Sequence, residues 1–344
     1  MDLQKPREIS RRNRLGFGVL RTLEHVFGNN VLHPPPARRL LEHAQDRVQR
    51  DILEELKHQG GGRTLDIAEV HSVDDLVLAR RRGYPAIIRG LAKAWPCTER
   101  WTMEFVARQW GDVPVNMIKD HITEADPVVG KTTIADVVKD IEGHKSTYAR
   151  FVPILHRHPD TLDDLDMEFC RAVICDGGPV RLWGEKGKDG VPLRSHLFLG
   201  EAGGVTKTHC ELTSNLFVNV RGQKAWVLIP AHYLPALNSP VTRNPGVFGT
   251  MFDPTIEDDP RFPLMKYCDI YRFELNSGDV LYVPPFVWHH VRTLTRSVSI
   301  GIRWYSWREA VEQTPLLNLL TILATRPTLY HAIKNAVEYG DVHG

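Results

Sequence analysis

The chain contains the stretch Thr206-Lys-Thr-His209-Cys-Glu211 and, further on, the stretch Val280-Leu-Tyr-Val-Pro-Pro-Phe-Val-Trp288-His289-His290. In an extended strand, side chains alternate between two faces, so His209 and Glu211 project to the same side and can bind one metal ion. His289 is the expected third ligand. Two imidazoles and one carboxylate that leave coordination positions open are typical of a non-haem Fe(II) site. These two stretches therefore predict a metal centre built on strands.

His290 competes with His289 for the third ligand position. Neighbouring residues of a strand face opposite ways, so only one of the two can face the metal. The alternation alone leaves both possibilities open.

The 344 residues are 42% hydrophobic and 25% charged, as in ordinary globular proteins, and they can form one large domain or two. The formal net charge of +1 gives no electrostatic reason to expect nucleic acid as an obligatory partner. The basic run Arg11-Arg12-Asn13-Arg14 is interpreted as a solvated surface segment.

Cysteine usage and apolar runs bear on the compartment. The five cysteines form no CxxC pair, and their odd number leaves at least one thiol unpaired, which favours a reducing environment. The N-terminus lacks the apolar region of a signal peptide, and no apolar run approaches the roughly 18 residues of a membrane span. We expect a cytoplasmic protein without a membrane span.

Local patterns divide the chain into three regions. Residues 1–62 form a helical region that ends in a run of glycines, residues 63–307 hold the metal-binding domain, and residues 308–344 are helical again. Strand signals dominate after about residue 180, and Arg221-Gly222-Gln223 is expected to form a tight hairpin. Helices are expected at 37–57, 102–110, 132–142 and 163–169, and strands at 85–90, 113–118, 197–200, 215–220, 225–229, 280–283 and 297–304.

The expected fold is mainly β with flanking helices. Its core is a double-stranded β-helix, the jelly-roll barrel, which would bring the two metal-binding stretches together across the 78 positions between Glu211 and His289.

The chain resembles the JmjC and cupin-like family of Fe(II)- and 2-oxoglutarate-dependent oxygenases, especially its small hydroxylase branch, which includes the asparaginyl hydroxylase of hypoxia-inducible factor. The similarity runs from Pro85-Ala-Ile-Ile-Arg-Gly-Leu-Ala-Lys-Ala-Trp95 to Trp304. The resemblance implies that His209, Glu211 and His289 bind iron, and that 2-oxoglutarate and O2 are cosubstrates. The family's Pro-x-x-Trp-His pattern favours His289 over His290.

The same resemblance implies a set of cosubstrate residues. Thr206 and Lys224 match the hydroxyl and ammonium that hold the distal carboxylate of 2-oxoglutarate, and Tyr148 resembles an upstream tyrosine used on the same carboxylate. Asn215 matches a polar group near the chelating end, and Phe217 matches a wall of the pocket. A buried carboxylate needs a cation beside it, because an unpaired buried charge is very costly.

Two positions depart from the hydroxylase branch. Glu211 stands where that branch has Asp, although the histone-demethylase branch often uses Glu. Ile302 stands where the asparaginyl hydroxylase has an Asn that contacts the cosubstrate, so that contact is expected to be absent. Substrate-recognition residues are not identified; polar or aromatic candidates around the barrel are Trp183, Arg194, His196, Arg292 and Arg303.

The resemblance implies hydroxylation of an unactivated C–H bond in a protein, peptide or small-molecule substrate, with release of succinate and CO2. N-demethylation within the same family and a non-catalytic, metal-binding cupin-like scaffold are the alternatives. The sequence has no Cys/His spacing typical of a zinc finger, which favours hydroxylation over histone demethylation.

A leucine-rich segment follows the predicted barrel. Leu316, Leu317, Leu320 and Leu323 share one helical face, which either pairs with a second copy or packs on the chain's own N-terminal helices. Because helix 37–57 is highly charged, we expect a homodimer through the C-terminal helices.

Overall fold

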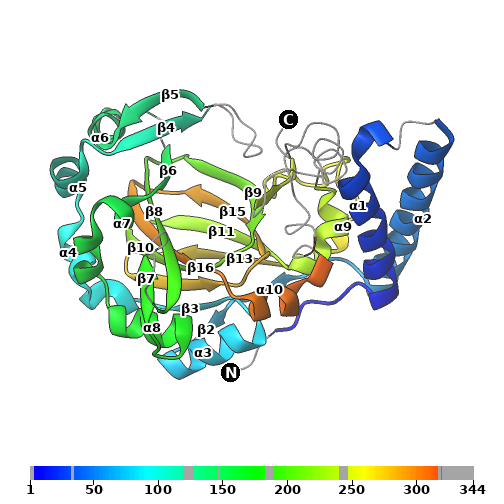
Figure 1. Ribbon diagram of the computed structural model, residues 1–344, viewed down its shortest axis with the longest axis horizontal. Coiled ribbons are helices and arrows are strands. Elements are labelled where there is room, and N and C mark those ends of the chain that lie inside the picture. The colour runs from blue at the N-terminus through cyan, green and yellow to red at the C-terminus, as the bar shows by residue number, and fades with distance from the viewer. Residues whose placement is uncertain are drawn as a thin grey trace.

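The computed structural model describes residues 4–31, 35–118, 128–145, 148–182, 189–239, 247–316 and 319. Its centre consists of a six-stranded and an eight-stranded sheet (Figure 1). The six-stranded sheet runs in the order β1 (Thr64–Leu65), β13 (Ile270–Leu275), β11 (Lys224–Ile229), β15 (Trp288–Thr293), β9 (Val205–Glu211) and β12 (Val247–Gly249).

The eight-stranded sheet forms the second wall of the barrel. Its order is β2 (Ala68–Glu69), β3 (Ala86–Ile88), β14 (Asp279–Val283), β10 (Ser214–Arg221), β16 (Ser297–Trp304), β8 (Val191–Gly200) and β6 (Tyr148–Val152), with β7 (Val180–Leu182) paired to β8. One apolar cluster draws residues from both sheets, among them Phe198, Phe217, Trp226 and Val291. This arrangement confirms the predicted jelly-roll core.

Helices cover the outer face of the eight-stranded sheet (Figure 1). These are α3 (Val73–Arg82), α4 (Pro96–Arg100), α5 (Met103–Trp110), α6 (Ile134–Glu142), α7 (Ile154–Arg157) and α8 (Met167–Cys175), with the 3-10 turns η1 (Leu91–Ala94) and η2 (Pro159–Asp164) and the hairpin β4 (Pro114–Ile118)–β5 (Val128–Thr133). The helix predicted over 163–169 is wrong in its bounds. The Asp166 side chain accepts a hydrogen bond from the Phe169 N–H and starts α8 at Met167.

The predicted hairpin at Arg221–Gln223 is also wrong. β10 and β11 belong to different sheets and pair with other strands, so the turn carries the chain from one wall of the barrel to the other. Gly222 has φ +79, and a Cβ there would lie 2.2 Å from the Arg296 carbonyl oxygen. Only glycine fits this crossing without strain.

The helices α1 (Arg11–Val31) and α2 (Pro35–Gln59) lie side by side at one end of the molecule (Figure 1). Ile52 and Leu56 of α2 are buried in an apolar cluster with Phe17 of α1 and with residues of the barrel's six-stranded sheet. The N-terminal helices thus offer an apolar face, contrary to what the charged sequence of α2 suggested. The remaining short elements are η3 (Ala231–Tyr233), α9 (Leu234–Leu237), η4 (Met265–Tyr267) and α10 (Trp307–Gln313).

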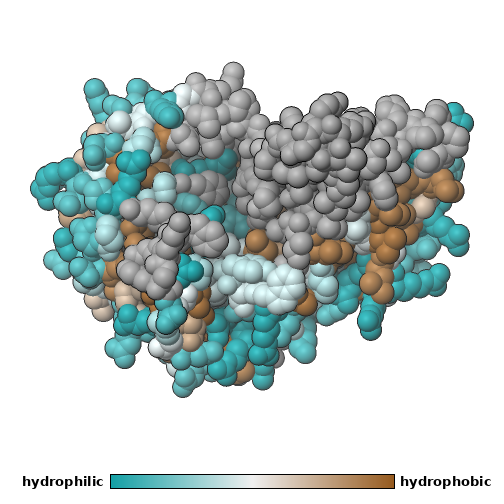
Figure 2. Space-filling model, in the orientation of Figure 1, coloured by the Kyte–Doolittle hydropathy of each residue, from teal (hydrophilic) through white to brown (hydrophobic). Residues whose placement is uncertain are grey.

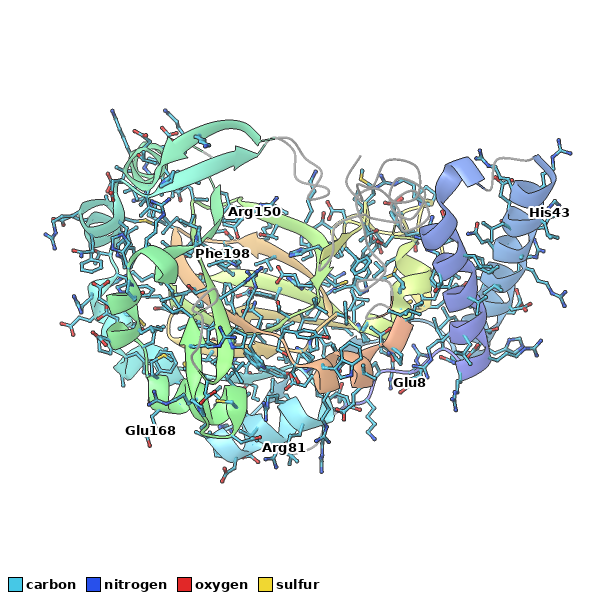
Figure 3. The ribbon with its side chains drawn as sticks, viewed as in Figure 1. Glu8, His43, Arg81, Arg150, Glu168 and Phe198 are labelled. Atoms are coloured by element: carbon cyan, nitrogen blue, oxygen red, sulfur yellow. The ribbon has the colours of Figure 1, made fainter. Side chains whose placement is uncertain are left out.

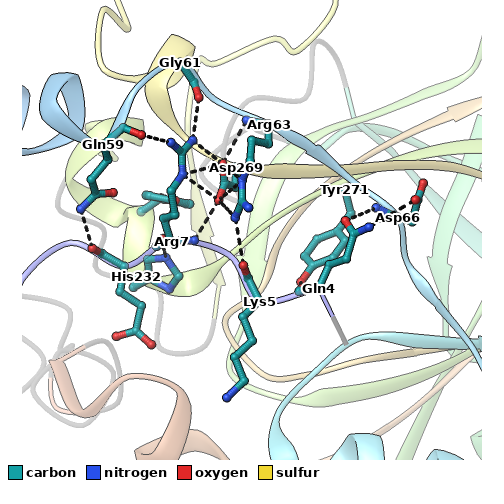
Figure 4. Close-up of polar contacts among 12 residues, drawn as sticks. Gln4, Lys5, Arg7, Gln59, Gly61, Arg63, Asp66, His232, Asp269 and Tyr271 are labelled. Carbon is teal, nitrogen blue, oxygen red and sulfur yellow. Dashed lines mark hydrogen bonds and ion pairs between the residues drawn. The ribbon is translucent and has the colours of Figure 1, made fainter. Parts of the chain in front are cut away.

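An extended N-terminal segment ties these helices to the barrel (Figure 4). The guanidinium groups of Arg7 and Arg63 both contact the buried carboxylate of Asp269, at 2.6 and 2.7 Å. Tyr233 Oη donates a hydrogen bond to the Arg7 carbonyl oxygen at 2.6 Å. The segment around Arg7 therefore contacts Tyr233 and Asp269, which lie more than 200 positions further along the chain.

Leu316, from the predicted leucine face, packs beside the apolar cluster that includes Phe17 and Ile52. Leu317, Leu320 and Leu323 lie outside the described residues, so the predicted dimer stays a prediction, as do the three predicted regions. All five cysteines are free thiols. Within the described ranges, no helix has the length and apolarity needed to cross a bilayer.

Candidate metal centre and cosubstrate pocket

Three side chains meet in the interior of the barrel. His209 on β9 and His289 on β15 lie directly opposite each other on antiparallel strands, with ring centroids 4.1 Å apart. Glu211 Oε1 lies 3.5 Å from His209 Nε2. One ligand atom from each of the three side chains lies within 4.8 Å of the others, and all three residues are buried. The structure therefore brings together the three predicted metal ligands.

Backbone contacts orient both imidazoles. His209 Nδ1 lies 2.8 Å from the Lys207 carbonyl oxygen, and His289 Nδ1 lies 3.0 Å from the Val287 carbonyl oxygen. Because a carbonyl only accepts, each Nδ1 carries a proton, and in the neutral imidazole this leaves the lone pair on Nε2. This tautomer is the one that a histidine needs to bind a metal through Nε2.

The charge states also suit a cation. Burial, and after it the neighbouring His209, lower the pKa of His289 to about 3, so His289 is neutral at pH 7. Burial alone would raise the pKa of Glu211, but the neighbouring Arg303 guanidinium brings it well below its usual range. Two imidazoles, of which His289 is neutral, and an ionised carboxylate fit a divalent ion such as Fe(II).

His290 lies on the opposite face of β15. Its Nδ1 is 3.4 Å from Thr208 Oγ1, and it is absent from the group of residues whose ligand atoms converge. The structure thus places His289, and not His290, beside His209 and Glu211.

Three of the predicted cosubstrate residues lie together on one side of the metal cluster. Tyr148 Oη and Thr206 Oγ1 are 3.0 Å apart, and the Lys224 ammonium lies 5.3 Å from the centroid of the Tyr148 ring. Lys224 is fully buried and donates a hydrogen bond to Thr293 Oγ1 at 3.1 Å. A buried cation flanked by two hydroxyl groups is a suitable site for one carboxylate of a small dicarboxylic acid.

Asn215 and Phe217 are inward-facing residues of β10, in the opposite sheet. Asn215 is 5% exposed, and its Oδ1 has no hydrogen-bond partner among the described residues. Phe217 packs against Phe198, which is labelled in Figure 3, and against Trp226. A buried amide oxygen without a partner is costly, so its presence here favours a site that a polar ligand completes.

Trp226 was missed by the sequence reasoning. It lies two residues after Lys224 on β11 and therefore faces the same side, with its ring stacked 5.9 Å from that of His289. The pocket beside the cluster is lined by Tyr148, Phe198, Thr206, His209, Asn215, Phe217, Trp226, His289, Val291 and Arg303. The period-two alternation from Lys224 was the signal that could have identified this wall.

On β16, the residue that faces the pocket is Arg303 and not Ile302, the position that the resemblance aligned with a cosubstrate contact. Ile300, Ile302 and Trp304 pack into the outer core beneath the helices, while Arg303 points into the barrel. Ile302 is thus not among the residues that line the pocket, whereas Arg303 is one of them. Arg303 Nε lies 2.8 Å from Glu211 Oε2, and the residue is 4% exposed.

The other candidates around the barrel are spread out. His196 contacts the Arg303 guanidinium, whereas the side chains of Arg194 and Arg292 are exposed. Trp183 lies outside the described residues.

A jelly roll with a histidine and carboxylate cluster inside it is the architecture of the cupin class. The chain belongs to the cupin-like domain family, whose profile matches residues 77–310. JmjC proteins, which are Fe(II)- and 2-oxoglutarate-dependent oxygenases, are among its relatives.

The chain is similar to several JmjC proteins at low identity. It is 26% identical over 243 residues to JmjC domain-containing protein D of Dictyostelium discoideum, covering 64% of this chain and 51% of that protein. It is 22% identical over 225 residues to lysine-specific demethylase 8 of Xenopus tropicalis, covering 64% and 48%. It is 23% identical over 270 residues to the human bifunctional peptidase and (3S)-lysyl hydroxylase JMJD7, covering 69% and 80%. The chain thus spans about half the length of the first two.

Proposed function

We propose that this chain is an Fe(II)- and 2-oxoglutarate-dependent dioxygenase that hydroxylates an unactivated C–H bond of a protein, peptide or small-molecule substrate. The observation that carries the proposal is the convergence of His209, Glu211 and His289 beside the buried cation of Lys224. A metal cluster alone fits many cupins. The adjoining carboxylate site is what favours a 2-oxo acid as cosubstrate.

His209, Glu211 and His289 would hold Fe(II) and leave the remaining coordination positions open. With iron bound, oxidation of 2-oxoglutarate by O2 to succinate and CO2 supplies the oxidant for the substrate. Lys224, Thr206 and Tyr148 would bind the distal carboxylate, and Asn215 would donate to the chelating end. The apolar side chains of Phe217, Trp226 and their neighbours would exclude water from the reacting groups.

The direct test is succinate formation by purified protein given Fe(II), 2-oxoglutarate and ascorbate. Turnover without the true substrate can be slow, so binding is measured beside it by titrating Mn(II) and then N-oxalylglycine, an unreactive analogue, into the protein. We expect both to bind and succinate to accumulate. Protein that binds neither ligand would contradict the proposal.

N-demethylation is the second candidate. It is the same hydroxylation applied to an N-methyl group, followed by loss of formaldehyde. Glu211 and the relatives named as demethylases favour it. Mass spectrometry of incubated candidate peptides distinguishes the outcomes, because hydroxylation adds one oxygen whereas demethylation removes a methyl group. Formaldehyde released in step with succinate would decide for demethylation.

A non-catalytic scaffold is the alternative from another class. It would bind Mn(II) but not N-oxalylglycine, and would form no succinate with any substrate offered. The buried and costly Lys224 argues against it, because a protein that only retains a metal has no need for a cation at that place.

A further inference from the structure

Arg303 is a buried arginine to which the proposed reaction assigns no role. It comes from β16 in the eight-stranded sheet and reaches across the barrel to Glu211 on β9 in the six-stranded sheet. The pair therefore links the two walls of the barrel beside the candidate metal centre.

The two oxygens of the Glu211 carboxylate have different surroundings. Oε1 faces the histidines, at 3.5 Å from His209 Nε2. Oε2 lies 2.8 Å from Arg303 Nε and accepts a hydrogen bond from Thr213 Oγ1 at 3.4 Å. One oxygen is thus directed to the metal cluster, and the other is held by protein groups.

The guanidinium group is itself fixed in orientation. Its Nη1 donates to His196 Nδ1, and its Cζ lies 5.7 Å from the centroid of the Phe198 ring. An arginine held at several points around its plane can fix the plane of a carboxylate, which a single ammonium does not do.

We propose that Arg303 is a positioning residue: it holds Oε2 of Glu211 so that the carboxylate presents Oε1 alone to the metal. This inference rests on the proposed metal site. Glu211 has one more methylene than an aspartate and so one more rotatable bond. Without the arginine it is free to turn, or to use both oxygens and block a coordination position that the cosubstrate needs.

The test measures binding of Mn(II) alone, by calorimetry, so that no turnover is required. Removing a group that orients a metal ligand typically weakens metal binding about 10- to 100-fold. We expect a loss in this range for Arg303→Met, which keeps the length and apolar stem of the side chain. A change of less than about threefold would overturn the inference.

A double-mutant cycle separates positioning from a merely structural role. In a Glu211→Asp background the carboxylate is withdrawn by one methylene, too far to contact Arg303. If Arg303 acts through Glu211, then adding Arg303→Met in this background changes Mn(II) affinity by less than about threefold. The same loss in both backgrounds would show that Arg303 only supports the barrel, and the inference would be wrong.

Two further variants complete the design. Arg303→Lys keeps the charge but not the planar guanidinium group, so it should recover less than half of the loss in binding free energy. Wild-type affinity in this variant would overturn the inference, even if Arg303→Met does not fold. Arg80→Met is the matched control, because Arg80 is also buried and paired, with Glu309 at 3.4 Å, but lies outside the barrel. We expect its Mn(II) affinity to equal that of the wild type.

Wild-type protein that binds no Mn(II) would contradict the proposed function, and not only the role of Arg303.

Discussion

At the scale of single residues, Lys224 combines a cost to folding with a role in binding. Its ammonium is fully buried, and burial lowers its pKa to about 7. The unfolded chain keeps this lysine protonated up to about pH 10.4. Between these values the unfolded state binds more protons than the folded state, so the stability of the folded protein rises with pH across this window.

We predict that Lys224→Met raises the free energy of unfolding of the ligand-free protein at pH 7, by about 1–3 kcal/mol, because a buried cation is replaced by an apolar side chain of similar length. The gain should shrink as the pH rises toward 10. Urea unfolding at several pH values measures it. A variant less stable than the wild type at pH 7 would show that Lys224 stabilises the empty barrel.

We predict that the affinity for N-oxalylglycine, measured on Mn(II)-loaded protein, falls as the pH rises above about 7, because the carboxylate needs the protonated ammonium. Lys224→Ala should weaken binding by about 2–3 kcal/mol, the size of one lost charge-assisted contact. It should also remove this pH dependence. Unchanged affinity in the variant would mean that another cation binds the distal carboxylate.

The two neighbouring histidines give a third prediction. His289→Ala should abolish Mn(II) binding with the fold retained, because it removes one of three ligands in the cluster. His290→Ala is the matched control on the opposite face of β15 and should bind Mn(II) like the wild type. Calorimetry on both variants, with circular dichroism to check the fold, measures this. The reverse result would assign the ligand to His290.

At the scale of elements, the N-terminal segment is fastened to β13 by one carboxylate. Asp269 precedes β13, its side chain is fully buried, and it accepts from the backbone N–H groups of Arg7 and Arg63 as well as from their guanidinium groups. Burial would raise the pKa of Asp269, but the two arginines hold it well below its usual range. The stabilisation therefore needs the ionised form and is lost in acid.

We predict that Asp269→Asn lowers the free energy of unfolding at pH 7 by about 2 kcal/mol. This is less than the roughly 3–5 kcal/mol typical of breaking a fully buried pair, since both arginines are partly exposed. The difference from wild type should decrease as the pH falls below the usual range of an aspartate. Asp259→Asn is the control, because Asp259 pairs locally with Arg261. An equal loss of stability in Asp269→Asn and Asp259→Asn would contradict the proposed role of Asp269 in fastening the N-terminal segment.

At the scale of the whole molecule, apolar side chains are exposed along α1 (Figure 2). Leu15, Val19 and Leu23 are four residues apart and 59%, 59% and 40% exposed, so they share one face of the helix. Leu316 lies beside Gly18 of the same helix, where the chain leads toward its C-terminus. An exposed apolar stripe of this kind is typical of an interaction surface.

We predict that the full chain is a homodimer and that truncation after Arg308 makes it monomeric. Val19→Glu should weaken the dimer, because a charge would enter the apolar stripe. Light scattering at micromolar concentration measures all three. Arg108→Glu, at an exposed position on α5 and away from the stripe, is the control. A monomeric full-length chain would rule against the dimer.

Sequence reasoning succeeded where the functional residues lie close together on one strand. His209 and Glu211 are two apart on one strand, and alternation alone gave them a common face. It failed at Arg221–Gln223, because a turn between consecutive strands looks the same whether the strands pair or enter different sheets. It also left Arg303 among general candidates, since the alternation along 297–304 does not say which face is the inside.

The sequence by itself predicted the jelly-roll class from its strand patterns and the pairing of His209 with Glu211 from local alternation, while the third ligand and the buried lysine came from spacings matched to a known family. Only the tertiary structure decided that β9 and β15 set His209 opposite His289, that Arg303 reaches Glu211 from the other sheet, and that the N-terminal segment is fastened at Asp269. The reason is physical. These contacts join residues 80 to more than 250 positions apart, and such pairs are set by how the two sheets close on a shared core.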